Sequence, residues 1–288
     1  MVWVNAVVQG ILVGGLYALF AAGLSLVFGV MRLVNLAHGD LAILSAYLAV
    51  ILADHAGWSP WLSLLVVVPV MAAVGFVLQV AVLNFTLDSG LAPLLATFGL
   101  AVIIQNALQE GFSANEQGLD AGAIETDSIH ITNQLSIGWF PLITLLAAVV
   151  LLGGLQIMIR HTSLGRALRA TSDDQRAAQL VGIDNRRLYG TAMAISLATA
   201  AVAGIFLGIR TTFDPYAGPI RLIFAFEAVI IGGLGSLWGT LLGCIVLGVA
   251  QGIGDQINPG WGVLAGHLVF LAVLVLRPAG LLGKVAPA

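Results

Sequence analysis

Residues 1–31, MVWVNAVVQGILVGGLYALFAAGLSLVFGVM, contain no charged side chain. A helix needs about 20 mostly apolar residues to cross the roughly 30 Å of hydrocarbon in a bilayer, so this stretch is long enough to span a membrane. Similar stretches follow along the whole chain. We predict about nine such segments, within a range of about eight to ten crossings: 5–29, 33–52, 62–85, 93–110, 139–159, 188–209, 222–234, 238–254 and 261–276. The short 222–234 segment suggests a half-helix or one arm of a re-entrant pair.

The composition supports a membrane location. Of the 288 residues, 59% are hydrophobic and 9% are charged, and the mean hydropathy is +1.03. Because a soluble domain carries about 25% charged residues, this chain cannot cover a water-facing surface. The composition therefore excludes a soluble enzyme, a nucleic-acid binder and a disordered chain. We predict an all-α polytopic membrane protein that forms a single domain over residues 1–288, with some spans broken or re-entrant.

Two residue counts limit the chemistry of the chain. Cys244 is the single cysteine, which excludes an intramolecular disulfide and argues against a cysteine-based metal site. Lys284 is the single lysine, and it does not follow the glycine run as a Walker-type phosphate loop requires. No second histidine or acidic cluster has the helical spacing of metal ligands. We therefore expect no metal and no cofactor in this chain.

The distribution of charge predicts an orientation in the membrane. Residues 160–187 hold more than half of the 11 basic residues, whereas residues 111–138 hold four acidic residues and no lysine or arginine. Under the positive-inside rule, 160–187 is cytoplasmic and 111–138 is extracytoplasmic. Arg32, Arg277 and Lys284 then lie inside, which places the N-terminus outside and the C-terminus in the cytoplasm. Arg210 and Arg221 fall on the outer side and are the exceptions.

The cytoplasmic stretch 161–188, HTSLGRALRATSDDQRAAQLVGIDNRRL, contains the signals of a short amphipathic helix. Ser172 followed by Gln175 matches a capping box, and Gly182 supplies a left-handed stop. One interpretation is a solvated loop that obeys the positive-inside rule. The other is a docking helix for a cytoplasmic partner, because a small apolar face with arginines around it suits insertion into a groove.

Polar residues at membrane depth are candidates for a translocation path, because an isolated charge there is costly. The candidates are Asn35, His38, Asp40, Gln105, Asn106 and Glu227. The structural alternative for His38 and Asp40 is a turn at the inner interface, where they pair with each other or with Arg32. The structural alternative for Glu227 is an ion pair with Arg221 or Arg210.

A run of glycines interrupts the apolar sequence near residue 235. It comprises Gly232, Gly233, Gly235, Gly239 and Gly243. The spacing of four residues from Gly235 to Gly243 is typical of close helix packing, as it is for Gly10 and Gly14 in the first span. The clustered glycines at 232–235 are also consistent with a break in the helix. Of the two interpretations, we favour helix packing.

Three stretches together resemble a known family. The run GRALRA at 165–170, followed by Asp173, Ala177 and Gly182-Ile183, resembles the coupling segment of ABC importer permeases. GLYALFAAGLSLVFGVMRLVNLAHGD at 15–40 and AVIIGGLGSLWGTLLG at 228–243 resemble the branched-chain amino-acid permease family within that group. The resemblance covers nearly the whole chain, and its length is similar to that of the shorter of the family's two permease subunits.

The resemblance implies a transport function without bond chemistry. The chain would be the permease subunit of an ATP-driven importer in a bacterial inner membrane, carrying branched-chain or other amino acids. Its partners would be a second homologous permease, two cytoplasmic ATPases that hold the ATP and magnesium, and an extracytoplasmic binding protein. The residues that would couple the chain to the ATPases are Gly165, Arg166, Arg169, Asp173, Ala177, Gly182 and Ile183.

A secondary transporter or channel is the alternative, with Asp40, His38 and Glu227 as a proton or cation relay. An integral membrane enzyme has less support, because no nucleophile–base pair or metal cluster is evident at membrane depth. The sequence leaves the substrate open among aliphatic amino acids, urea, amides and aromatic acids. It also leaves open whether two copies of this chain pair or a homologous partner is needed, and we expect the heteromeric arrangement.

Overall fold

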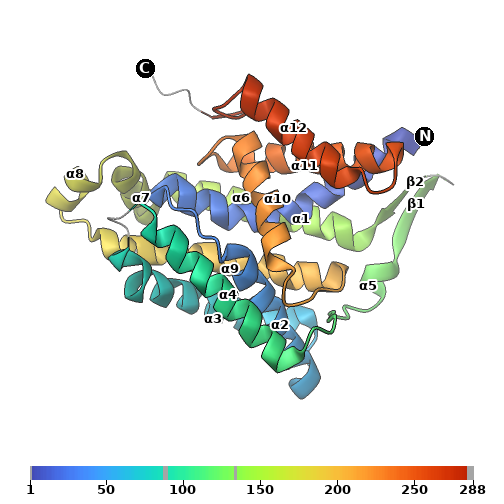
Figure 1. The fold of residues 1–288 in the computed structure, drawn as a ribbon, viewed down its shortest axis with the longest axis horizontal. Coiled ribbons are helices and arrows are strands. Elements are labelled where there is room, and N and C mark those ends of the chain that lie inside the picture. The colour runs from blue at the N-terminus through green and yellow to red at the C-terminus, as the bar shows by residue number, and fades with distance from the viewer. Residues whose placement is uncertain (1, 87–89, 133–134, 284–288) are drawn as a thin grey trace.

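The computed structural model describes residues 2–86, 90–132 and 135–283, and most of them are helical (Figure 1). The long helices are α1 Val2–Met31, α2 His38–Ala56, α3 Pro60–Ala81, α4 Ala92–Phe112, α6 Trp139–His161, α9 Asn185–Arg210, α10 Gly218–Gly232, α11 Leu237–Ile257 and α12 Gly262–Leu276. The shorter elements are η1 Leu83–Phe85, α5 Ala123–Thr126, α7 Ser163–Asp173, α8 Gln175–Leu180, β1 Ser128–Thr132 and β2 Leu135–Gly138. Each predicted segment coincides with one of the long helices, which confirms the all-α polytopic fold.

The long helices differ in whether they can cross a bilayer alone. Within the described residues, seven are long and apolar enough to do so: α1, α2, α3 with η1, α4, α6, α9 and α11. Helices α10 and α12 have 15 residues each. At 1.5 Å per residue they extend about 22 Å, which is less than the roughly 30 Å of a hydrocarbon core. The prediction of a short segment at 222–234 is therefore confirmed, and α12 is shorter than a full span as well.

Helices α1 and α9 form the centre of the bundle. In their most apolar windows 83% and 78% of the residues are buried, compared with 22% in α3 and in α6. α1 packs against α6, α9, α10 and α11, and α3 packs along α9. A Cβ added to Gly10 would lie 2.6 Å from Val249 Cα on α11, so the prediction of close packing at Gly10 is confirmed. The outer faces of α3, α4, α6 and α12 expose large apolar side chains, as lipid-facing helices do.

The glycine run packs two helices together and also breaks the chain between them. Gly232 lies against Gly239, and Gly243 lies against the Ala228 carbonyl, so α10 and α11 approach backbone to backbone. Gly233 has φ +103° and Gly235 has φ +79°, a conformation that L side chains rarely adopt. Both sequence interpretations are therefore correct at different glycines.

The predicted cytoplasmic and extracytoplasmic segments lie at opposite ends of the molecule. In Figure 1, α7 and α8 lie at one end, and the N-terminus, α5 and the β1–β2 hairpin lie at the other. The hairpin is antiparallel, with Ser128 paired to Gly138 and Ile129 to Ile137. The predicted acidic loop at 111–138 is thus partly folded. Lys284, one of the residues used for the orientation, lies outside the described residues.

Candidate translocation site and coupling segment

The chain re-enters the bundle after α1. α1 ends at Met31, but α2 begins only at His38, whose Nε2 is 3.0 Å from the carbonyl oxygen of Phe20 in the body of α1. The backbone nitrogen of Leu36 donates to Thr97 Oγ1 on α4 at 3.2 Å. Residues 32–37 therefore run back alongside α1, and α2 starts inside the bundle rather than at its end.

Polar side chains at this helix start are almost completely buried. Asn35, His38 and Asp40 are each 1% exposed. Asn35 Oδ1 accepts a hydrogen bond from the Ala37 nitrogen at 3.0 Å, which orders the turn into α2. Gln105 Nε2 on α4 donates to Asp40 Oδ1 at 2.9 Å, while Asp40 Oδ2 is buried and has no partner among the described residues. Four of the predicted path residues are thus gathered at one place.

The N-termini of α2 and α10 meet beside Asp40. Gly39 packs against the Gly218 carbonyl, and a Cβ on Gly218 would overlap the Asp40 carboxylate. A helix N-terminus carries a partial positive charge, so the two helix ends and the Asp40 carboxylate attract each other. Helices that begin inside a bundle, with their N-termini at a polar site, are a recurrent way to build binding sites in transporters.

A second polar group lies between α1, α10, α11 and α12. Glu227 Oε1 lies 2.5 Å from His267 Nδ1, and Tyr17 Oη donates to Gln251 Oε1 at 2.6 Å. The Phe224 ring lies between the two pairs, with centroid distances of 5.3 Å to Tyr17 and 6.2 Å to His267. Glu227 Oε2 is buried without a partner in the described part of the chain. A hollow of about 450 Å³ between α1 and α11 reaches Tyr17 and Gln251.

The contacts of these groups revise the sequence alternatives. The hydrogen-bonded partner of Glu227 is His267, and no described ion pair joins Glu227 to Arg221 or Arg210, so the alternative pairing with an arginine is wrong. His38 bonds to the α1 backbone and Asp40 bonds to Gln105, so neither bonds to the other. A relay would require a chain of hydrogen bonds from the α2 start to the Glu227 pair. In the described residues, no hydrogen bond links these two groups.

Asn106 lies apart from both groups. Its side chain is exposed on α4 and donates to the Val102 carbonyl at 2.7 Å. Of the two predicted polar residues on α4, only Gln105 therefore reaches a buried partner.

The 160–187 segment forms two helices instead of one. Ser172 lies within α7 and donates to the Gly29 carbonyl at 2.7 Å, so the prediction that Ser172 begins a helix is wrong. Asp174 caps the N-terminus of α8, and its Oδ1 accepts from the nitrogens of Arg176 at 2.8 Å and Ala177 at 3.0 Å. The aspartate takes the capping role because it satisfies two free amides of the first turn.

The end of α8 presents an apolar surface, which we call the α8 tip: Ala177, Leu180 and Val181. Leu180 is 89% exposed and Val181 is 78% exposed, whereas Ala178 is buried. Gly182, with φ +89°, ends the helix as predicted. Large apolar side chains that are this exposed on a polar segment mark an interaction surface.

The other predicted coupling residues lie on α7 and directly after α8, and they have different environments. Gly165 is buried against the Met158 and Ile159 carbonyls, which fixes α7 on the end of α6. Ile183 is half-buried and its nitrogen bonds to the Ala178 carbonyl at 3.1 Å. Arg166, Arg169 and Asp173 are exposed along α7.

Comparison with known families identifies the chain. The family described as "Branched-chain amino acid transport system / permease component" matches residues 6–276. The chain belongs to this family. The match includes the α2 start, the Glu227 pair and both helices of the 160–187 segment.

Curated relatives match over almost the same length. The chain is 29% identical to the high-affinity branched-chain amino acid transport system permease protein BraD of Pseudomonas aeruginosa, over 98% of this chain and 96% of BraD. It is 28% identical to LivH of Escherichia coli, over 96% of this chain and 94% of LivH. It is 27% identical to LivM of the same organism, over 94% of this chain and 69% of LivM. No solved structure matches the chain.

The sequence did not predict every polar residue near Glu227 in this member of the branched-chain family. Tyr17, Gln251 and His267 were not among the predicted residues. His267 carried a usable signal, because it is the only ionisable residue in the apolar run 256–276. Tyr17 and Gln251 carried none, because their pairing joins positions that are 234 residues apart.

Proposed function

We propose that this chain is a permease subunit of an ATP-driven ABC importer for branched-chain or other amino acids in a bacterial inner membrane. A second homologous permease completes the translocation path, and an extracytoplasmic binding protein delivers the substrate. ATP and magnesium bind to two separate cytoplasmic ATPases, so this chain performs no bond chemistry. Its N-terminus lies outside and its C-terminus lies in the cytoplasm.

The α8 tip is the observation that carries the proposal. It projects from the end of the molecule that holds most of the arginines, and Leu180 and Val181 are its most exposed side chains. Insertion of this surface into a groove of an ATPase gives a mechanical link to the spans through α7, α6 and α9. Closure of the ATPase pair then moves the segment and rocks the spans between outward-open and inward-open states.

Affinity purification of the tagged chain in mild detergent tests the composition of the importer. We expect mass spectrometry to find two ATPases with Walker motifs and a second permease bound to the chain. Recovery of the chain alone, together with uptake into vesicles that needs no ATP, would contradict the proposal. That result would support the secondary transporter with Asp40, His38 and Glu227.

The two buried carboxylates are proposed to lie on the path of the substrate ammonium group. Each has one hydrogen-bonded oxygen and one oxygen without a partner in the described residues. Because hydrogen bonds to charged groups contribute about 1.5–3 kcal/mol, we expect Asp40→Asn and Glu227→Gln each to lower uptake by about tenfold. Asparagine at position 40 can still accept from Gln105, so this variant removes charge without removing that contact.

Uptake of radiolabelled leucine into ATP-loaded vesicles measures both variants. Asn106→Ala is the matched control, because that exposed amide bonds only within its own helix. If Asp40→Asn and Glu227→Gln transport at the rate of the control, the carboxylates have a structural role and are not on the path.

A further inference from the structure

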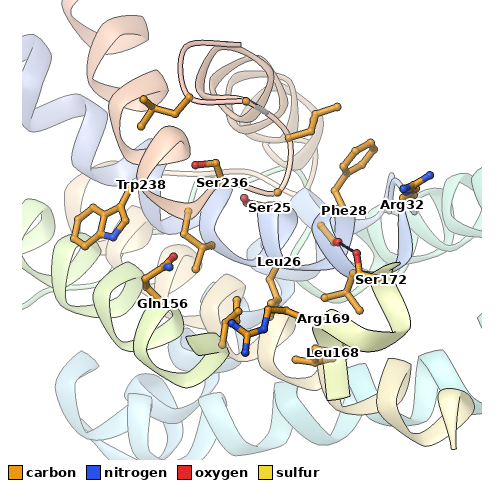
Figure 2. Close-up of a pocket in the computed structure, with 18 of the residues that line it drawn as sticks. Ser25, Leu26, Phe28, Arg32, Gln156, Leu168, Arg169, Ser172, Ser236 and Trp238 are labelled. Carbon is orange, nitrogen blue, oxygen red and sulfur yellow. Dashed lines mark hydrogen bonds between the residues drawn. The ribbon is translucent and has the colours of Figure 1, made fainter. Parts of the chain in front are cut away.

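A hollow of about 720 Å³ lies at the end of the molecule that holds α7 and α8. It is bounded by the end of α1, by α6 and α7, and by the connection from α10 into α11. Figure 2 shows Trp238 and Gln156 on one side of the hollow and Arg32 and Ser172 on the other. The volume is within the range of small-ligand pockets, which is about 300–1,000 Å³. Asp40, Glu227 and the α8 tip are not part of this hollow, whereas Arg169 and Asp173 from the predicted coupling residues line it.

The lining has an excess of positive charge. Arg32, Arg160 and Arg169 line the hollow, and Asp173 is the only acidic residue in the lining. In the part of the chain that the structure describes, none of these arginines forms an ion pair. The guanidinium groups therefore provide hydrogen-bond donors and positive charge that no acidic side chain in the described residues neutralises by an ion pair.

The N-terminus of α11 adds to this donor-rich lining. α11 begins at Leu237, and Ser236 caps it by accepting from the Gly239 nitrogen at 3.1 Å. Ser236, Leu237 and Trp238 all line the hollow, so the positive end of a 21-residue helix faces the same space as the arginines. A helix N-terminus with arginines beside it favours a phosphate group.

The rim of the hollow has the character of a membrane surface. Trp238 is 42% exposed and Leu234 is 46% exposed, and Leu242 one turn further along α11 is 43% exposed. Tryptophan is enriched at the membrane–water interface, where its ring is apolar and its N–H is wetted. Basic pockets between spanning helices on the cytoplasmic side are typical sites for lipid headgroups.

We propose that this hollow binds the phosphodiester headgroup of an anionic phospholipid from the cytoplasmic leaflet. The arginines and the α11 N-terminus contact the phosphate, and the acyl chains leave past Trp238 and Leu242. The proposal rests on the proposed orientation, in which this end of the bundle faces the cytoplasm. The bound lipid would hold α7 against α1 and α11, next to the contact between Ser172 and Gly29.

Native mass spectrometry of the purified full-length chain with added short-chain phosphatidylglycerol tests the site. An arginine near a membrane surface contributes about 1 kcal/mol to binding an anionic lipid, which is about fivefold in affinity. We therefore expect Arg160→Gln with Arg169→Gln to weaken binding by about 25-fold. Arg176→Gln removes one positive charge from exposed α8, outside the hollow, and we expect its affinity to stay within twofold of the unchanged chain.

A conservative pair separates loss of charge from loss of fold. Arg160→Lys with Arg169→Lys keeps the charges, and we expect it to bind within about fivefold of the unchanged chain. Equal phosphatidylglycerol binding by the glutamine pair and the Arg176 control would overturn the proposal. Equal binding of zwitterionic phosphatidylethanolamine, or displacement of the lipid by millimolar inorganic phosphate, would also overturn it, the latter by indicating a free-anion site. Because neither ATPase recovery nor uptake is measured, failure here leaves the importer proposal untouched.

Discussion

Gly204→Leu is expected to lower recovery of the folded chain at least tenfold. Gly204 lies in α9 where that helix crosses α2, and a Cβ there would overlap the Ala42 carbonyl oxygen and Ser45 Oγ. Ser45 Oγ already donates to the Ala42 carbonyl at 2.5 Å and lies 3.3 Å from the Ala201 carbonyl. The obstacle is therefore backbone, together with a hydroxyl that is fixed between the two helices.

The expected loss follows from the position of this crossing. Adding atoms to a packed core costs about 1–3 kcal/mol where neighbours can yield, and helix backbones yield less than side chains. A loss of even 1–2 kcal/mol changes the folded-to-unfolded ratio by about 5–30-fold. Displacement of α2 would also move His38 and Asp40 away from Phe20 and Gln105. We expect at least a tenfold drop in the monodisperse peak on size-exclusion chromatography in mild detergent.

Gly154→Leu is the matched control. Gly154 lies in α6, is exposed, and has no atom within 4 Å of the position of an added Cβ. Leucine there adds an apolar side chain to an apolar face and removes the helix penalty of glycine, which is about 1 kcal/mol. We expect Gly154→Leu to give as much monodisperse protein as the unchanged chain. Equal loss in both variants would contradict the role assigned to the α2–α9 contact.

Hydropathy predicted the long helices because the bilayer imposes a simple constraint. Backbone groups in hydrocarbon must be satisfied internally, so an apolar run of span length has little alternative to a helix. The predicted span 5–29 therefore lies within α1, which extends a few residues further at the N-terminus and two residues further at the C-terminus. The re-entry at 32–37 was not predictable in the same way, because it depends on a contact between His38 and the Phe20 carbonyl. Hydropathy does not distinguish a span that starts at residue 33, as predicted, from a helix that starts at residue 38, as observed.

The site was only partly predictable, because its pairings join distant parts of the chain. Single polar residues at depth identified Asp40, Gln105 and Glu227 as candidates, but not which residues pair with each other. The structural alternative for Glu227 paired it with Arg221 or Arg210, whereas its partner His267 is 40 residues further on, in α12. Local capping rules also failed at Ser172, because the Gly29 carbonyl on α1 competes for its hydroxyl. In each case the tertiary contact decided between local alternatives that the sequence permits.

Leu180→Glu is expected to weaken both binding of the ATPases and ATP-driven uptake. Leu180 is 89% exposed at the α8 tip, so docking would bury nearly all of it. Full burial of a leucine side chain contributes about 1.5–3 kcal/mol, and a carboxylate in the same groove adds a desolvation penalty. We therefore expect ATPase affinity to fall at least about 10–100-fold, with a similar loss of ATP-driven uptake. Co-purification of the ATPases and leucine uptake into ATP-loaded vesicles measure the two effects.

A substitution at Leu180 tests docking more directly than a substitution at Gly182. Gly182 has φ +89°, so Gly182→Arg would strain the backbone whatever the partner does, and its effect would not isolate docking. Leu180 ends a helix and is 89% exposed, so its replacement removes little packing within the described residues. Ser163→Glu introduces the same charge at the exposed first turn of α7, where a helix N-terminus favours it, and we expect normal uptake. Retention of the ATPases by Leu180→Glu, with uptake equal to that of Ser163→Glu, would show that the α8 tip is not the surface through which the ATPases act.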